Sequence, residues 1–159
     1  MPLKIAAKVD KVDRDYFSTI IEPLLRGPNI EFLGEISDAE KGKFLGEAAA
    51  LLFPIDWPEP FGLAMIEAMA NGTPVVAFRC GAVPEIIDDG VTGLVVDSIE
   101  EAVVAVPRAL KLSRVRVRRE FERRFCADRM ARDYLAVYEG QCHGRALRRP
   151  RLQIAEAMT

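Results

Sequence analysis

The 159-residue chain is half hydrophobic, which suits one folded domain with a buried core and excludes an extended disordered protein. Its net charge of −2 is uneven, because residues 1–113 carry 10 basic and 18 acidic side chains whereas residues 114–151 carry 12 arginines and 5 acidic ones. The three cysteines show no Cys-x-x-Cys spacing, which disfavours a disulfide framework or a zinc site. No apolar run approaches the roughly 20 residues of a membrane span. We therefore expect a cytoplasmic protein, with peripheral attachment to the inner membrane surface left open.

Short apolar runs alternate with helix-length amphipathic segments along the first two thirds of the chain. The apolar runs are typical of strands covered by helices on both faces, and they predict strands at 3–9, 30–34, 49–55, 74–78 and 93–97. The segments between them predict helices at 12–25, 37–48, 61–70 and 83–89. This alternation predicts an α/β fold, a Rossmann-like parallel sheet of about five strands flanked by helices.

Beyond Ser98 the pattern predicts only helices, at 98–111, 114–125 and 127–141. We expect one domain over residues 1–142 and a flexible or frayed tail over 143–159. The arginines of 114–132 are mixed with Asp and Glu at helical spacing. That mixture favours a solvated, salt-bridged face over a surface for nucleic acid or membrane, so no nucleic-acid partner is expected.

The stretch PEPFGLAMIEAMANGTPVVAF, residues 58–78, predicts an anion site where a strand ends and a helix begins. The prolines hold Glu59 extended, and the helix is expected to start near Phe61 or Gly62. The unpaired N–H groups of Phe61, Gly62 and Leu63 would then receive a phosphate, assisted by the helix dipole.

Two carboxylates flank this predicted anion site. The side chain of Glu67 leans back toward the helix N-terminus and can accept both hydroxyls of a ribose diol. Glu59 would face a hydroxyl-rich group such as a sugar near its anomeric carbon, and it is our candidate catalytic residue. Glutamates near helix starts are also common as plain surface groups, and that alternative stays open.

Other residues carry weaker hypotheses. Gly81 and Ala82 begin a second loop-to-helix junction, where their N–H groups would contact a bound sugar or form an ordinary turn. Asp13 and Asp15 spell Asp-x-Asp but open a helix, which favours capping over metal binding, so no metal site is expected. His143 lies in the tail, which argues against histidine-based catalysis within this chain.

The residues EPFGLAMIEAMANGTPVVAF, followed by CGAVPEIIDDGVTGLVVD, resemble glycosyltransferase family 4, the group 1 glycosyltransferases of GT-B fold. The hallmark is Glu-x7-Glu with Phe-Gly after the first Glu, and about two thirds of the chain follows the family pattern. The resemblance implies that Glu67 holds the ribose of a nucleotide sugar and that Glu59 lies near the donor sugar. It also implies diphosphate contacts from the N–H groups of 61–63 and backbone contacts to the base near Ile36.

The chain also departs from the family pattern. The acceptor-binding N-terminal domain, the first strand of the C-terminal domain and a Gly-Arg plus Lys phosphate clamp have no counterpart before Leu3. We therefore expect part of a GT-B C-terminal domain that lacks its first strand. Either 3–9 pairs directly with 49–55, or the exposed sheet edges are covered by another copy of the chain.

The expected function is the donor-binding part of a retaining glycosyltransferase of hexosyltransferase type, without a cofactor or metal. It would move a sugar from a nucleotide diphosphate sugar to an unknown acceptor, which is a glycan, a lipid or a small molecule, and this part alone is expected to be inactive. Two alternatives remain: a GT-B nucleotide-sugar epimerase-like domain, and a noncatalytic interaction domain with the same fold.

Overall fold

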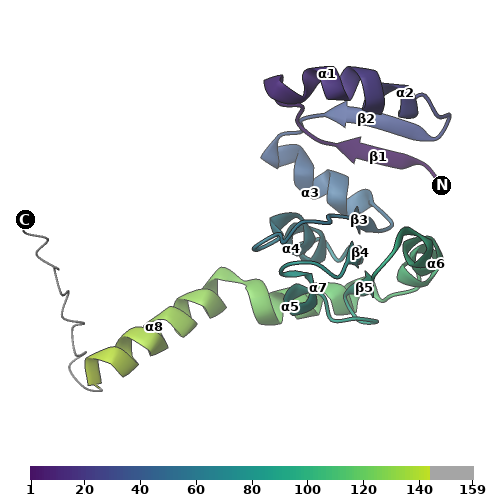
Figure 1. The fold of residues 1–159 in the computed structure, drawn as a ribbon. Helices are drawn as coiled ribbons and strands as arrows, with labels where there is room; N and C mark the ends of the chain where they lie inside the picture. The colour runs from purple at the N-terminus through teal and green to yellow at the C-terminus, as the bar shows by residue number, and fades with distance from the viewer. Residues whose placement is uncertain (144–159) are drawn as a thin grey trace, which may run out of the picture.

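The structure is a computed structural model that describes residues 1–143 (Figure 1). Apart from the backbone of His143, the expected tail at 143–159 lies outside the described residues. All five expected strands form, and none extends beyond its predicted range. They are β1 Leu3–Ala6, β2 Ile30–Gly34, β3 Leu51–Phe53, β4 Val75–Phe78 and β5 Gly93–Val96.

Helices form in every segment where the sequence predicts them. The segment between β1 and β2 is a series of short turns: η1 Lys11–Asp13, α1 Arg14–Tyr16, η2 Phe17–Ile21 and α2 Glu22–Leu24. The following helices are α3 Asp38–Glu47, α4 Leu63–Ala70 and α5 Val83–Ile86. The last three are α6 Ile99–Ala109, α7 Arg114–Phe125 and α8 Ala127–His143.

The strands are all parallel, as predicted, but they form two sheets. β1 pairs with β2, and the second sheet has the order β3, β4, β5. The expected pairing of 3–9 with 49–55 is therefore wrong. The physical reason is that β3 takes β4 as its partner, with residues 51–53 in parallel register with residues 75–77, while β1 takes β2.

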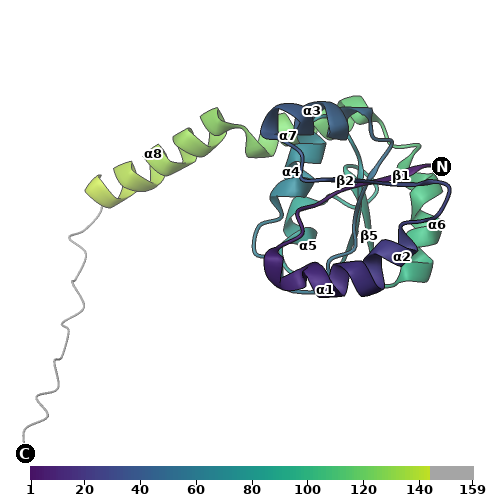
Figure 2. The same cartoon turned by 90° about the horizontal axis from the view of Figure 1, so that it is seen from above.

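The buried core lies around β4, whose side chains alternate between two helical layers. Val75 and Ala77 belong to the cluster that contains α4, and Val76 belongs to the cluster that contains α6. Figure 2 shows α4 and α6 on opposite sides of β5. No residue of 1–44 is buried, so the core begins at Leu45.

Helix α8 extends away from the sheets, as Figure 1 shows. Its side chains through residue 141 are exposed, including five large apolar ones: Met130, Tyr134, Leu135, Val137 and Tyr138. Among residues 1–143, none of the helices combines the length and the apolar character needed to cross a membrane.

Candidate functional site

The two predicted carboxylates lie on either side of the start of α4. Glu59 belongs to the loop that follows β3, and Glu67 lies in the second turn of α4. The helix begins at Leu63, with Gly62 as its N-cap at φ 71°, a left-handed conformation that favours glycine. The site thus stands beyond the carboxyl end of β3, where open α/β sheets bind their ligands.

Glu59 fills the predicted anion site with its own carboxylate. Its Oε1 accepts the N–H of Gly62 at 3.0 Å and the N–H of Phe61 at 3.4 Å. These bonds, with the Gly62 N–H first, hold the pKa of the Glu59 carboxyl below its usual value. The main-chain N–H groups just before α4 therefore hold an anion in this protein, and that anion is the carboxylate of Glu59.

Glu67 is held by a lysine that the sequence analysis did not single out. Lys41 on α3 places its Nζ 3.0 Å from Oε1 of Glu67 and 3.0 Å from Oδ1 of Asp38. These two acids, Glu67 first, raise the pKa of Lys41 above its usual value. No local spacing could reveal this pair, because the two partners lie 26 residues apart in the chain.

The junction at Gly81 and Ala82 packs directly against the main chain of Glu59. The Ala82 N–H donates to the Glu59 carbonyl at 2.9 Å. Gly81 has φ 53°, and a Cβ there would collide with the backbone of Glu59. The loop that carries Glu59 and the loop that carries Gly81 and Ala82 are thus joined. The Ala82 N–H is already hydrogen-bonded within the protein.

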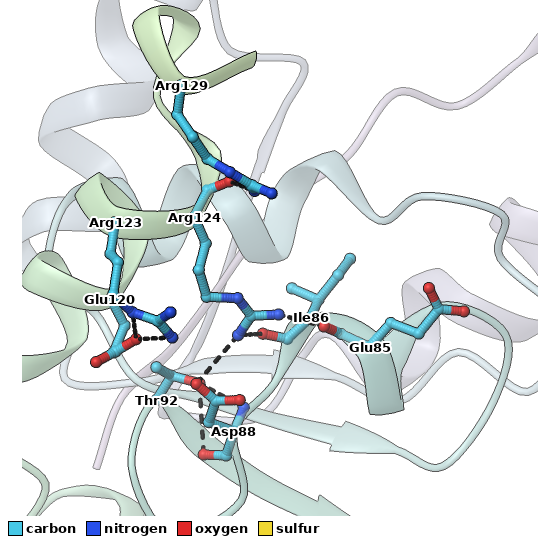
Figure 3. A network of polar contacts seen from close by, with 8 residues as sticks. All are labelled: Glu85, Ile86, Asp88, Thr92, Glu120, Arg123, Arg124 and Arg129. Atoms are coloured by element: carbon cyan, nitrogen blue, oxygen red, sulfur yellow. Dashed lines mark hydrogen bonds and ion pairs between the residues drawn. The ribbon is translucent and has the colours of Figure 1, made fainter. Parts of the chain in front are cut away.

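An arginine from α7 holds the second loop in place, as Figure 3 shows. Arg124 donates to the carbonyls of Ile86, at 3.0 Å, and Glu85, and its guanidinium lies 3.1 Å from the Asp88 carboxylate. These contacts satisfy carbonyls at the end of α5. They therefore hold the segment that begins at Gly81 at its C-terminal end.

The arginine prediction is correct for part of 114–132 and wrong for Arg114 and Arg124. It is incomplete for Arg118, which pairs within its helix but also donates to the carbonyl of Ala70 in α4. Ion pairs within helices form the expected solvated face: Arg118–Glu122, Arg123–Glu120 and Arg129–Asp133. Arg114 and Arg124 instead reach into the body of the domain and bind main-chain carbonyls. Helical spacing places charges on a face but does not show when that face packs against carbonyl groups.

Of the remaining predicted residues, Ile36 lies apart along the chain, whereas Phe61 and Leu63 stand between the two glutamates. Ile36 follows β2, is half-buried and directly precedes Ser37, the N-cap of α3. Phe61 and Leu63 expose their side chains, so their main-chain groups are what the site can use. Within the part of the chain that the structure describes, no group of three or more His, Cys, Asp or Glu side chains is placed to hold a metal ion.

The parallel α/β fold, with a loop and a helix N-terminus at the strands' carboxyl ends, is of the Rossmann-like type, in which ligands bind at that edge of the sheet. Residues 4–124 match the family model of the glycosyl transferases group 1, and the chain belongs to this family.

Curated relatives and solved structures place the chain in the same group. It is similar to a phosphatidyl-myo-inositol mannosyltransferase of Mycobacterium leprae, 34% identical over 70% of this chain and 32% of the relative. It is also similar to a glycogen synthase of Mycobacterium tuberculosis, 31% identical over 79% of this chain and 32% of the relative. The chain thus spans about a third of the length of these relatives.

The fold matches solved glycosyltransferases of GT-B architecture. Anabaena Alr3699/HepE in complex with UDP and glucose superposes with a TM-score of 0.74 at 19% identity, covering 87% of this chain and 40% of that one. AviGT4, a glycosyltransferase involved in avilamycin A biosynthesis, superposes with a TM-score of 0.71 at 25% identity, covering 91% and 44%. The chain thus spans about two fifths of the length of these solved proteins.

Proposed function

We propose that this chain is the donor-binding part of a retaining group 1 glycosyltransferase and binds a nucleoside diphosphate sugar at the start of α4. Glu67 accepts the ribose hydroxyls, and Lys41 holds its carboxylate in place. The diphosphate takes the N–H groups at residues 61–63. Glu59 moves from those groups to the sugar.

The observation that carries the proposal is the carboxylate of Glu59 on the N–H groups of Phe61 and Gly62. A site that holds one anion by two main-chain donors can hold another of similar size, such as a phosphate. Glu67 lies in the second turn of α4, with its Oε1 bound to Lys41, and its second oxygen would accept from the diol. Neighbours in complex with UDP or UDP-glucose lend support, because these are ligands of proteins with the same fold.

The proposal includes transfer without a metal ion, to an acceptor held by a part of the enzyme that this chain does not span. The chain alone is then expected to bind donor without transferring its sugar. Transfer by a longer enzyme that contains this chain should continue in the presence of EDTA. A loss of transfer that Mg²⁺ or Mn²⁺ restores would contradict the metal-free mechanism.

Calorimetry with UDP-, GDP- and ADP-sugars tests the donor site directly. We expect one of these to bind saturably, and we expect Glu67→Ala to weaken it by about 1.5–3 kcal/mol, the value of a hydrogen bond to a charged group. Glu47→Ala, on the solvated face of α3, is the matched control and should leave the affinity unchanged.

Lys41→Met supplies a second check on the same site. It should weaken donor binding in the otherwise unchanged protein and have no further effect in the Glu67→Ala variant, because the two side chains act as a pair. Saturable binding that neither substitution changes would contradict this site. Absence of binding to all three nucleotide sugars, in this chain and in a longer enzyme containing it, would favour the noncatalytic interaction domain.

A further inference from the structure

Helix α5 and the loop before it connect α7 to the loop that carries Glu59. α5 has only four residues, with Pro84 near its start, so its own hydrogen bonds stabilise it little. Its position therefore depends on contacts with other elements. Val83 and Ile86 are buried in the core cluster that contains α4. Apolar packing is non-directional, so these two side chains anchor α5 without fixing its exact orientation.

The directional contacts to this segment come from Arg124 on α7, as Figure 3 shows. Its guanidinium donates to the carbonyls of Ile86, at 3.0 Å, and Glu85, and it lies 3.1 Å from the carboxylate of Asp88. The Arg124 side chain is only 18% exposed, so these contacts are less screened by water than those of a surface ion pair. Asp88 is itself held, because its N–H donates to the hydroxyl of buried Thr92 at 2.9 Å.

The other end of the segment holds the main chain of Glu59. The N–H groups of Glu85 and Ile86 donate to the Ala82 carbonyl at 3.0 and 3.1 Å, and the Ala82 N–H donates to the Glu59 carbonyl at 2.9 Å. Among residues 1–143, the Ala82 bond is the only hydrogen bond between residues 54–61 and a segment outside the loop from β3 to α4. A continuous set of hydrogen bonds thus runs from Arg124 to Glu59.

We propose that Arg124 is a positioning residue for Glu59 and thereby governs how the site recognises the sugar of its donor. Arg124 does not touch the donor. It holds the carbonyls of α5, and α5 in turn holds the Glu59 main chain through the Ala82 N–H. The effect on sugar recognition rests on the proposed function, in which Glu59 faces the sugar. The structural link from Arg124 to Glu59 does not depend on donor binding.

This link bears on the sugar rather than on the nucleotide. The ribose is assigned to Glu67, which is held by Lys41 on α3, whereas the polar contacts of the Arg124 guanidinium go to residues 85–88. Loss of Arg124 should therefore weaken the binding of a nucleotide sugar and leave the binding of the matching free nucleoside diphosphate nearly unchanged. A general loss of stability would instead weaken the binding of both ligands alike.

The test compares Arg124→Met with Arg114→Met at a temperature at which circular dichroism shows both variants to be folded. Arg114 is the matched control, because it also lies on α7 and binds main-chain carbonyls, but those at the end of α3. Calorimetry measures the affinity for UDP-, GDP- and ADP-sugars and for the matching free diphosphates. We expect the ratio of the two affinities to fall about tenfold in Arg124→Met, the effect of one lost hydrogen bond. The ratio should stay unchanged in Arg114→Met.

A second measurement needs no donor. Hydrogen exchange followed by NMR reports on the amides of Ala82 and Gly62, which donate to the carbonyl and the carboxylate of Glu59. Both amides should exchange several-fold faster in Arg124→Met than in Arg114→Met. Arg124→Lys keeps the positive charge near Asp88 but lacks the planar fork that reaches both carbonyls, so its effects should be intermediate. The lysine variant carries both measurements if the methionine variant does not fold.

Three results would overturn the proposal. The first is unchanged exchange of the Ala82 amide when Arg124 is replaced. The second is equal acceleration in the Arg114 variant, which would reflect lower stability alone. The third is an equal loss of affinity for the nucleotide sugar and the free diphosphate. If the unchanged protein binds no nucleotide sugar, the proposed function fails, and the exchange measurement alone decides whether Arg124 positions Glu59.

Discussion

The carboxylate of Glu59 has one role in the structure and another in the proposed complex. In the structure it accepts the N–H groups of Phe61 and Gly62 just before α4, and in the proposed complex a diphosphate takes those groups. Because these bonds lower the pKa of Glu59, their contribution to stability is complete above the ordinary glutamate pKa. That contribution is lost only as the pH falls through the lower pKa of the folded protein. At neutral pH the carboxylate therefore competes fully with an incoming anion.

This competition predicts that removing Glu59 strengthens the binding of a bare anion. In Glu59→Ala the N–H groups of Phe61 and Gly62 lose their acceptor, so pyrophosphate should bind several-fold more tightly, measured by calorimetry at pH 7. The preference for a nucleotide sugar over the free nucleotide should fall in the same variant. Glu100→Ala is the control, because Glu100 is also held by main-chain and Ser98 bonds at a helix start, that of α6. Weaker pyrophosphate binding in Glu59→Ala would contradict the competition.

The sequence identifies the residues of the candidate site better than it identifies the groups that they contact. The Glu-x7-Glu spacing correctly places both glutamates at the start of one helix, because helix boundaries follow local signals such as proline and glycine. Lys41 was missed, because its contact with Glu67 depends on how α3 packs on α4. The bond from Glu59 to Gly62 was missed for another reason. The sequence shows which donors a helix start leaves unpaired, but it does not show that a neighbouring side chain occupies them.

Among the elements, α3, α4 and α7 are joined by a single side chain. Arg114, at the start of α7, donates to the carbonyls of Ala48 at 2.6 Å and Gly46 at 2.7 Å, at the end of α3. It also donates to the hydroxyl of buried Thr73 at 2.9 Å, just after α4. Helices leave their last carbonyls unpaired, and this arginine satisfies those of α3.

Loss of this arginine should lower the stability of the whole domain. We expect Arg114→Met to reduce the free energy of unfolding by about 2–3 kcal/mol, because part-buried carbonyl groups lose their donors. Urea denaturation followed by circular dichroism measures this. Arg116→Met, on an exposed position of the same helix, should change stability by less than about 0.5 kcal/mol. Equal effects of the two substitutions would show that the contacts of Arg114 contribute nothing.

The strands were predictable as elements but their pairing was not. The apolar runs of β3, β4 and β5 pack into the two core clusters, as strands covered by helices do. The separation of β1 from β3 depends on long-range packing that no local pattern contains. The prediction of unpaired edges came from the expected strand order rather than from periodicity. It is confirmed for β1 and β3, and association of copies through those edges stays a prediction.

For the molecule as a whole, buried residues are confined to one part of the chain. The core runs from Leu45 onward, whereas the unit formed by β1, β2 and the turns between them has no buried residue. Its apolar contacts include Phe17 against Phe32, with ring centroids 5.1 Å apart. Local stability follows the density of buried contacts, so this unit should be the weaker one.

We expect residues 3–34 to open before the rest of the domain. In native-state hydrogen exchange with increasing urea, the amides of β1 and β2 should exchange at a lower free energy than those of β4. Phe32→Ala should lower that opening energy alone. Met69→Ala, fully buried in the core, should lower the global value by about 2–5 kcal/mol. One common free energy for all five strands would contradict a weaker N-terminal unit. It would mean that the edges of β1 and β3 cost the protein little stability.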